Sequence, residues 1–330
     1  MGGIPIQRPP LDEAVRTINR AIDLGVNFID TSIGYGDSEV RIGKAISGRR
    51  NEVIIATKGS AGDQVKTLKS IEDSLRRLNI NNIDLWQFHG VSTKEEIDLI
   101  LRKDGGLNGA REALSAGKID HIGFSSHNPD IAKRLIETDL FETVQFPFDF
   151  VAREAADEII PMAKKHDMGF IAMKPFAGGN IRDASLAIRY LLQFDNVVPD
   201  PGIEKAEEIE EIAKIVEGPW ELTEVDWKDI ERIRGELNGK FCRQCMYCMP
   251  CPNGVQVWLL TYMKNLYRLW PRELFLGRPI FAEAAESGKK CVRCGVCETR
   301  CPYKLPIREM IEESMDIYNR VAGGETPPTQ

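Results

Sequence analysis

Apolar and polar positions follow two alternating periods along residues 1–218. Short apolar runs such as Ile83–Phe88 are typical of buried strands, and the stretches between them space apolar residues three and four positions apart, as amphipathic helices do. Eight strand-like runs separated by helices within this length predict an α/β fold, a (β/α)8 TIM barrel. We place the strands at Gly3–Ile6, Val26–Ile29, Val53–Ala56, Ile83–Phe88, Ile119–Ser125, Thr143–Phe148, Gly169–Met173 and Val197–Pro201.

A doubly wound open sheet is the competing architecture for this alternation of strands and helices. That fold needs a glycine-rich phosphate loop after its first strand, whereas the chain has the proline-rich segment Ile4–Pro10 there. The barrel is therefore the favoured fold. Its helices are expected at Leu11–Leu24, Ser38–Ser47, Lys66–Leu78, Thr93–Leu101, Pro129–Thr138, Ala155–His166, Asp183–Phe194 and Ala206–Val216.

The pattern changes at Gly218-Pro219, and this change divides the chain into domains. We expect the barrel over residues 1–218, a linker with a bridging helix over 219–240, a small and mostly helical domain over 241–322, and a flexible tail over 323–330. The bridging helix is placed at Thr223–Leu237, and the helices of the small domain near Val255–Leu266, Arg278–Ser287 and Pro306–Ala322.

Charge and composition narrow the function classes. The net charge is −7 and no basic stripe stands out, so we expect neither nucleic acid nor a membrane as a partner. No apolar run is long enough to span a bilayer and no signal peptide precedes the first helix, which predicts a cytoplasmic protein. All eight cysteines lie after Phe241, and in that compartment they indicate metal or redox chemistry rather than disulfides.

The cysteines form two compact runs. The first is Cys242-x2-Cys245-x2-Cys248-x2-Cys251-Pro252, and the second is Cys291-x2-Cys294-x2-Cys297-x3-Cys301-Pro302. Three cysteines at this spacing wrap one face of an iron–sulfur cubane, and a fourth followed by proline typically reaches the other cluster. The second run has the bacterial ferredoxin pattern, and the first is one residue shorter before its last cysteine.

Structural zinc is the alternative for these runs, but zinc sites usually join two separated Cys-x2-Cys pairs. The chain therefore predicts two [4Fe-4S] clusters in a ferredoxin-like domain. With the fourth cysteines exchanged, one cluster is held by Cys242, Cys245, Cys248 and Cys301, and the other by Cys291, Cys294, Cys297 and Cys251.

Ionisable side chains follow three successive predicted strands at the same end. Asp30 follows one strand, with Tyr35 in the glycine-flanked loop beyond it, Lys58 follows the next strand, and His89 the one after. The carboxyl ends of parallel barrel strands converge on the face that carries catalytic groups. Singly, these residues have ordinary explanations as a helix cap, a loop contact, a surface lysine and a core histidine. Their joint placement predicts an active site.

With these residues in this order, residues 2–218 resemble the aldo-keto reductase family. Asp30, Tyr35, Lys58 and His89 match its catalytic tetrad in order, strand position and spacing. The resemblance implies nicotinamide-dependent aldehyde or ketone reduction, or alcohol oxidation, with Tyr35 as proton donor. An ammonium near a phenol favours the phenolate, so Lys58, held by Asp30, would lower the pKa of Tyr35 from about 10. His89 would orient the carbonyl and donate a hydrogen bond to the alkoxide. Structural roles are expected for His121, His127 and His166.

The resemblance also assigns a nicotinamide site. Ser125 and Ser126 match positions that bind the carboxamide, Gln145 matches a glutamine at the same group, and Lys174 begins a loop that closes over the pyrophosphate. After the last strand, the segment around Gly202 leads into glutamates where many members carry basic residues for the 2′-phosphate. Carboxylates repel a phosphate but accept a hydrogen bond from a ribose hydroxyl, so both NADP and NAD are implied.

The order of the two domains resembles the iron–sulfur branch of that family. It implies an oxidoreductase that acts on a small carbonyl or alcohol and couples this chemistry to electron transfer through two clusters, with a redox partner protein. A hydride carries two electrons whereas each cluster takes one, and no flavin signature is present. Two alternatives stay open: a carbonyl reductase with purely structural clusters, and a non-catalytic electron-transfer or sensor protein on a degenerate barrel.

Besides the 2′-phosphate site, the start of the chain departs from the family pattern, and the identity of the substrate is not given by the sequence. The N-terminal hairpin that usually plugs the barrel is missing before Met1, so we expect either a truncated start or another cover for the barrel floor. Substrate specificity is expected to depend on loops such as Lys103–Gly109, and the sequence of these loops does not identify the carbonyl substrate.

Overall fold

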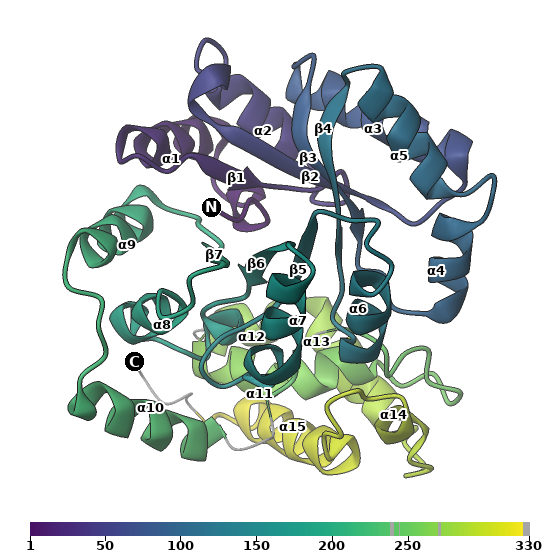
Figure 1. Cartoon of the computed structure of the whole chain (residues 1–330). Helices are drawn as coiled ribbons and strands as arrows, with labels where there is room; N and C mark the ends of the chain where they lie inside the picture. Colours follow the sequence, from purple (N-terminus) through teal and green to yellow (C-terminus); the bar gives the residue numbers. More distant parts are fainter. Residues whose placement is uncertain (238–240, 244, 270–271, 326–330) are drawn as a thin grey trace. The chain divides into compact units, whose positions relative to one another are not determined.

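The computed structural model describes residues 1–237, 241–243, 245–269 and 272–325 (Figure 1). The chain forms two compact units. The first comprises Met1–Ala177 and Ile181–Glu231, and the second comprises Gly178–Asn180 and the residues from Arg232 onward. Among the helices of these described residues, none is both long and apolar enough to cross a membrane.

The first unit is built on a parallel sheet that curves into a barrel (Figure 1). Its seven strands are hydrogen-bonded in sequence order, each to the next. This order and the helices between the strands confirm the predicted barrel class. The strands are β1 (Phe28–Asp30), β2 (Ile54–Ser60), β3 (Ile83–His89), β4 (Ile119–Ser125), β5 (Thr143–Pro147), β6 (Gly169–Met173) and β7 (Val197–Asp200).

A single residue takes the place of the eighth strand. Gly2 makes parallel bridges both to Asp30 at the end of β1 and to Gly202 just beyond β7, so it joins the two edges of the sheet. The predicted strand at Gly3–Ile6 is wrong, because Pro5–Gln7 forms a 3₁₀ helix. Proline has no N–H to donate to a neighbouring strand, which ends the pairing after one residue.

The helices of the first unit follow the predicted positions closely where the apolar spacing is regular. Ala14, Ile18 and Ala21 lie on one face of α1 and are fully buried. Asp63 accepts a hydrogen bond from the backbone N–H of Lys66 and so begins α3. The helices are α1 (Leu11–Asp23), α2 (Ser38–Ala45), α3 (Gln64–Leu78), α4 (Lys94–Leu101), α5 (Gly106–Ser115), α6 (Pro129–Ile136), α7 (Ile160–Lys165), α8 (Ala184–Leu191) and α9 (Ala206–Glu217). Helix α10 (Glu224–Leu237) begins in the first unit and ends in the second.

Helix α5 was not predicted, and it begins inside the segment that we expected to be a substrate loop. Its glycines lower helix propensity and hide the helix from a reading of the sequence. The structure gives the reason for one of them. A Cβ at Gly109 would lie 2.5 Å from the backbone oxygen of Gln64, so only glycine allows α5 to approach α3 this closely.

The predicted helix over Ala155–His166 is divided into two parts. Ala155–Ile159 forms a π-helical turn, and α7 follows it with Pro161 in its first turn. Because proline lacks an N–H and its ring collides with the preceding turn of an α-helix, the wider π turn accommodates Pro161 without ending the helical path.

The second unit is helical and has its own apolar core. Leu260 and Met263 of α11, Phe281 of α13 and Ile311 of α15 are buried in this core, and several of the cysteines pack against it. The short helices α12 and α14 were not predicted, because five and four residues are too few for a periodic pattern. The helices are α11 (Val257–Leu269), α12 (Arg272–Leu276), α13 (Pro279–Gly288), α14 (Val296–Thr299) and α15 (Ile307–Ala322).

The close approach of α2 to the end of α3 gives a stability prediction. A Cβ at Gly43 would lie 2.2 Å from the backbone oxygen of Leu78. We therefore expect Gly43→Ala to lower the free energy of unfolding by about 2 kcal/mol, because the backbone cannot yield as a side chain can. Chemical denaturation followed by circular dichroism measures this change.

Gly235 in α10 provides the matched control. A Cβ there would meet no atom within 4 Å, so Gly235→Ala should raise the free energy of unfolding by about 0.5–1 kcal/mol through helix propensity. Equal effects of the two substitutions would contradict the close packing of α2 on α3.

Candidate active site and cysteine cavities

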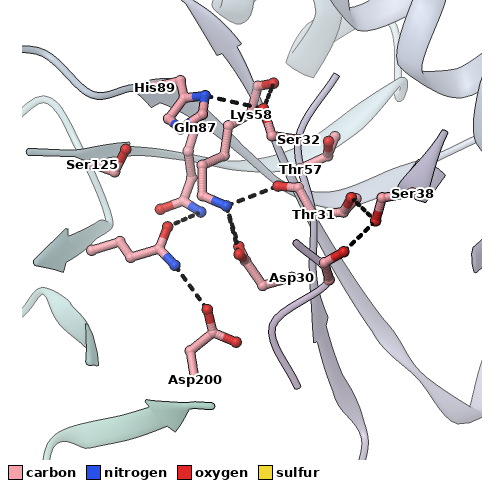
Figure 2. A network of polar contacts seen from close by, with 12 residues as sticks. Asp30, Thr31, Ser32, Ser38, Thr57, Lys58, Gln87, His89, Ser125 and Asp200 are labelled. Atoms are coloured by element: carbon pink, nitrogen blue, oxygen red, sulfur yellow. Dashed lines mark hydrogen bonds and ion pairs between the residues drawn. The ribbon is translucent and has the colours of Figure 1, made fainter. Parts of the chain in front are cut away.

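Three neighbouring strands carry polar side chains to the same end of the barrel (Figure 2). Asp30 is the last residue of β1, His89 is the last residue of β3, and Lys58 lies near the end of β2. The parallel register pairs Lys58 with Gln87 and Ser60 with His89, so these strand ends are level. The structure thus brings together the four residues of the predicted site, with Tyr35 in the loop after β1.

A buried ion pair lies at the centre of this group. Lys58 is 1% exposed and Asp30 is 2% exposed. The Nζ atom of Lys58 lies 2.7 and 2.6 Å from the two carboxylate oxygens of Asp30 and 2.8 Å from the backbone oxygen of Thr31. The ammonium is therefore held by acceptors from β1 and the residue after it. Burial, the largest single effect, lowers the pKa of Lys58, but Asp30, Tyr35 and Asp200 together outweigh burial, and the pKa is raised.

Tyr35 lies against this ion pair and against His89. The Nζ atom of Lys58 is 5.1 Å from the centre of the Tyr35 ring. The rings of Tyr35 and His89 meet edge to face with their centres 5.5 Å apart. Burial raises the pKa of Tyr35, and Lys58 lowers it without cancelling the effect of burial, so the net shift is upward. The sequence predicted a lowered pKa for Tyr35, and this prediction is wrong. Lys58 does lower the pKa, as expected, but burial raises it more.

His89 is neutral at physiological pH and contacts a serine. Burial, together with the charge of Lys58, lowers its pKa to about 4. The Nδ1 atom of His89 lies 3.0 Å from the hydroxyl oxygen of Ser32. The same hydroxyl lies 3.1 Å from the backbone oxygen of Lys58 and accepts a hydrogen bond from the N–H of Gly34. Ser32 was not among the predicted site residues, because a serine in a loop after a strand carries no distinguishing signal.

The three residues expected at the carboxamide are all buried, but they differ in their partners. Ser126 donates to the backbone oxygen of Val91 and accepts from the N–H of Asn128, so it serves the loop after β4. Ser125 accepts from the N–H of Gly90 and keeps its own hydroxyl proton for another acceptor. Gln145 is hydrogen-bonded on both sides, as described next.

A chain of polar side chains crosses the barrel interior below Lys58 (Figure 2). Gln87 donates to the side-chain oxygen of Gln145 at 3.4 Å, and Gln145 donates to Asp200 at 3.1 Å. The side-chain oxygen of Gln87 is buried and has no hydrogen-bond partner among the described residues. An amide needs one donor and one acceptor, and the Ser125 hydroxyl and the Gln87 oxygen offer these. The residues present therefore fit a nicotinamide carboxamide, with Gln87 added to the predicted set.

Asp200 is a second carboxylate at this end of the barrel. It is 6% exposed at the end of β7. Burial and the negative charge of Asp30 raise the pKa of Asp200 to about 7. It was missed, although the rule that found Asp30, an acid at the end of a predicted strand, applies to it equally.

The remaining predicted cofactor residues lie in loops after β6 and β7. Lys174 follows β6 with a left-handed backbone (φ 60°). Burial and the charge of Lys174 lower the pKa of His127 well below its usual value. Gly202 pairs with Gly2. Beyond it, the carboxylate of Glu208 accepts the backbone N–H groups of Glu204 and Lys205 just before α9, so a negative charge already lies at the start of this helix.

A model of the aldo/keto reductase family matches residues 2–186, which is more than half of the chain. The chain belongs to the aldo/keto reductase family. It is 29% identical over 189 residues to the uncharacterized oxidoreductase YqkF of Bacillus subtilis (strain 168), in a match that covers 53% of this chain and 60% of that protein. The chain therefore spans less than two thirds of the length of this relative.

Solved aldo-keto reductases share the barrel. The holo form of AKR11C1 from Bacillus halodurans has a TM-score of 0.62 at 22% identity, covering 71% of this chain and 90% of that one. A Klebsiella pneumoniae aldo-keto reductase in complex with NADPH has a TM-score of 0.60 at 20% identity, covering 68% and 85%. The glycerol dehydrogenase AKR11B4 from Gluconobacter oxydans has a TM-score of 0.59 at 23% identity, covering 72% and 90%. These likenesses confirm the fold of the reductase barrel.

The eight cysteines of this aldo/keto reductase family member line two separate cavities in the second unit. One is lined by Cys242, Cys245, Cys248 and Cys301, and the other by Cys251, Cys291, Cys294 and Cys297. Each run of the sequence thus gives three cysteines to one cavity and its fourth to the other. Each cavity offers the four sulfur donors that a [4Fe-4S] cluster takes. A model of the 4Fe-4S dicluster domain matches residues 241–305.

The chemistry of the donors also fits iron. Burial, reinforced by the neighbouring Cys242 and Cys245, raises the pKa of Cys248 to about 12. Cysteine binds metal as the thiolate, so these sulfurs need a positive charge between them to ionise together, which a bound metal such as iron or zinc would supply.

The division of the cysteines between the cavities predicts the outcome of paired substitutions. Cys301→Ala combined with Cys242→Ala should leave about half of the iron, because both residues line one cavity. Cys301→Ala combined with Cys291→Ala should lose nearly all of the iron, because the two residues line different cavities. Iron and sulfide analysis after anaerobic reconstitution measures both.

The opposite pair provides the control. Cys251→Ala with Cys291→Ala should leave about half of the iron, because both residues line one cavity. Cys251→Ala with Cys242→Ala should lose nearly all of it, because these residues line different cavities. If pairs within one sequence run always leave half of the iron, the exchange of fourth cysteines is disproved.

Proposed function

We propose that this chain is a nicotinamide-dependent oxidoreductase that interconverts a small carbonyl compound and its alcohol at Tyr35. The observation that carries this proposal is the buried pair of Lys58 and Asp30 beside the Tyr35 ring and His89 at the carboxyl ends of the barrel strands. A buried ammonium ion that contacts a phenol is suited to proton transfer, because its charge stabilises the phenolate that forms.

The proposed reaction adds a hydride and a proton to the carbonyl. A bound reduced nicotinamide would supply the hydride to the carbonyl carbon. The hydroxyl of Tyr35 gives its proton to the carbonyl oxygen, and the phenolate left behind lies next to the ammonium of Lys58. Because Asp30 keeps the pKa of Lys58 raised, the ammonium stays charged throughout. In the direction of alcohol oxidation, the same phenolate takes the proton back.

We propose Ser32 as a residue that positions His89. The Ser32 hydroxyl has one proton, which it can give either to the backbone oxygen of Lys58 or to Nδ1 of His89. His89 is neutral, so it carries a proton on only one ring nitrogen. It can donate from Nε2 to a carbonyl oxygen only when Nδ1 carries no proton, and a hydrogen bond donated by Ser32 to Nδ1 favours that tautomer.

For the cofactor we propose that Ser125 and Gln87 hold the carboxamide, that Gln145 orients Gln87, and that Lys174 contacts the pyrophosphate. Both NADP and NAD remain proposals. The Glu208 carboxylate at the start of α9 favours NAD, because it disfavours a further phosphate at this helix end.

We further propose two [4Fe-4S] clusters in the cysteine cavities, with a role in electron transfer to a redox partner protein. The second candidate, a carbonyl reductase whose clusters stabilise the small domain, is favoured by the packing of the cysteines against that domain's apolar core. Electron-transfer clusters and structural clusters require the same residues in the barrel. Redox measurements on the holoprotein are therefore needed to distinguish the two roles.

The proton-donor role of Tyr35 gives a direct prediction. Tyr35→Phe should lower kcat for carbonyl reduction by at least about 100-fold, because the general acid is lost. The dissociation constants of NADH and NADPH should stay within about threefold of the wild type, because the ring is kept. Anaerobic stopped-flow measurements with each nicotinamide provide both values.

The absorbance of the iron–sulfur clusters serves as the second readout in the same experiment. Bleaching on addition of NADH or NADPH supports electron transfer between the two units. Unchanged absorbance during turnover supports purely structural clusters. Full activity of the Tyr35→Phe protein would contradict the assignment of Tyr35.

The role of Ser32 is tested by the tautomer of His89. In the wild type at pH 7, the ¹⁵N chemical shifts of His89 should show the proton on Nε2. Ser32→Ala should shift the proton towards Nδ1 and lower kcat by about tenfold, since a positioned hydrogen-bond donor is lost. Ser32→Thr, which keeps the hydroxyl, is the matched control and should restore both. A proton on Nδ1 in the wild type would exclude His89 as the donor to the carbonyl.

A further inference from the structure

The segment around the second cysteine run carries a positive charge that the chain as a whole does not. Six lysines and arginines and one glutamate lie between Lys289 and Arg308, in a protein with a net charge of −7. Three of these cations are paired with acids: Lys289 with Glu286, Arg293 with Glu312, and Arg308 with Glu298 at 2.7 Å. The pairs leave three further cations.

These three are Lys290, Arg300 and Lys304, and all of them are exposed. None of them forms an ion pair with an acid in the described parts of the chain. Arg300 donates to the backbone oxygen of Pro250, which holds its guanidinium near the first cysteine run. Their charges are therefore available to an approaching molecule.

Two of the paired cations lie at one of the two cysteine cavities, and one of the unpaired cations lies beside it. Arg293 and Arg308 line the cavity of Cys251, Cys291, Cys294 and Cys297. Both also line an adjoining surface hollow of about 390 Å³, together with Lys304, Glu298 and Glu309. The hollow and the cavity thus share their basic residues.

The two cysteine cavities differ in their access to solvent. Arg243 is 6% exposed at the first cavity, with its guanidinium 4.5 Å from the centre of the Tyr303 ring and 5.4 Å from that of Phe241. Arg243 and Tyr303 thus line the first cavity as a packed pair, whereas Met246 of the same cavity is 49% exposed. At the second cavity, Cys294 is exposed, and the neighbouring Val292 is 67% exposed. Cys294 is therefore the cysteine of this cavity that an approaching molecule can reach most directly.

We propose that Lys290, Val292, Arg293, Arg300 and Lys304 form a docking surface, the basic face, for an acidic one-electron carrier protein. The basic face steers a negatively charged partner towards Cys294, and Val292 supplies a small apolar contact at its centre. Such encounters bury little area and are short-lived. Each encounter moves one electron and no proton, and the carrier gains the electron that the unit loses. The inference rests on the proposed electron-transfer function of the cysteine cavities.

The experiment measures binding of the reconstituted full-length holoprotein to oxidised flavodoxin, an acidic carrier, by isothermal titration calorimetry. We expect the dissociation constant to rise about tenfold between about 20 and about 200 mM salt, because the attraction is between exposed charges. Lys290→Glu with Lys304→Glu should also raise it at least about tenfold at low salt. Basic cytochrome c should not bind the wild type.

A matched double variant separates the basic face from net charge. Lys103→Glu with Lys228→Glu changes the total charge equally at two exposed lysines of the first unit, and it should change the dissociation constant by less than about threefold. An equal loss in both double variants, no binding of flavodoxin, or equally tight binding of a DNA oligonucleotide would overturn the proposal.

Two further readouts keep this test independent of the proposed function. Iron content and visible absorbance of Lys290→Glu/Lys304→Glu should equal those of the wild type, as should its rate of nicotinamide-dependent carbonyl reduction without flavodoxin. If carbonyl reduction is absent in every protein while flavodoxin binding depends on the basic face, the proposed reaction fails and the docking surface stands.

Discussion

The ion pair between Lys58 and Asp30 is the interaction on which the reductase site depends. Burying an ammonium ion costs several kcal/mol unless acceptors replace its water, and Asp30 and the backbone of Thr31 provide them. The charge that is kept in this way acts on both neighbours, because it opposes the upward shift in the pKa of Tyr35 and lowers the pKa of His89. If Lys58 were neutral, it would neither attract Asp30 nor change the pKa values of Tyr35 and His89.

The two units are stabilised by different means. In the barrel, each strand pairs with the next strand along the chain, and the helices between them cover the sheet. Glycines such as Gly43 and Gly109 allow close contact between helices. The cysteine-rich unit has a smaller core. There, Cys251 and Cys301 each line the cavity of the other sequence run. A cluster bound in either cavity would be held by cysteines of both runs, and it would therefore cross-link the two runs in addition to the contacts of the small core.

Part of the candidate site followed from one rule, that ionisable groups at successive strand ends meet. The rule found Asp30, Lys58 and His89, and it would have found Asp200 had it been applied to the last strand. It could not find Ser32 or Gln87. Their relevance comes from hydrogen bonds to His89 and Gln145, residues distant in sequence, and a serine or glutamine has no distinguishing pattern of its own.

The sequence by itself determined the barrel, the cysteine-rich domain and the spacing of the cysteines, because periodic apolar positions and metal-ligand spacing are local properties of the chain. Only the tertiary structure decided how the barrel closes at Gly2 and where α5 lies, whereas the exchange of the fourth cysteines was already expected from their spacing. The tertiary structure also decided the net shifts in the pKa values of Tyr35 and His89. Each of these depends on burial and on contacts between residues far apart in the chain, and such contacts leave no periodic trace in the sequence.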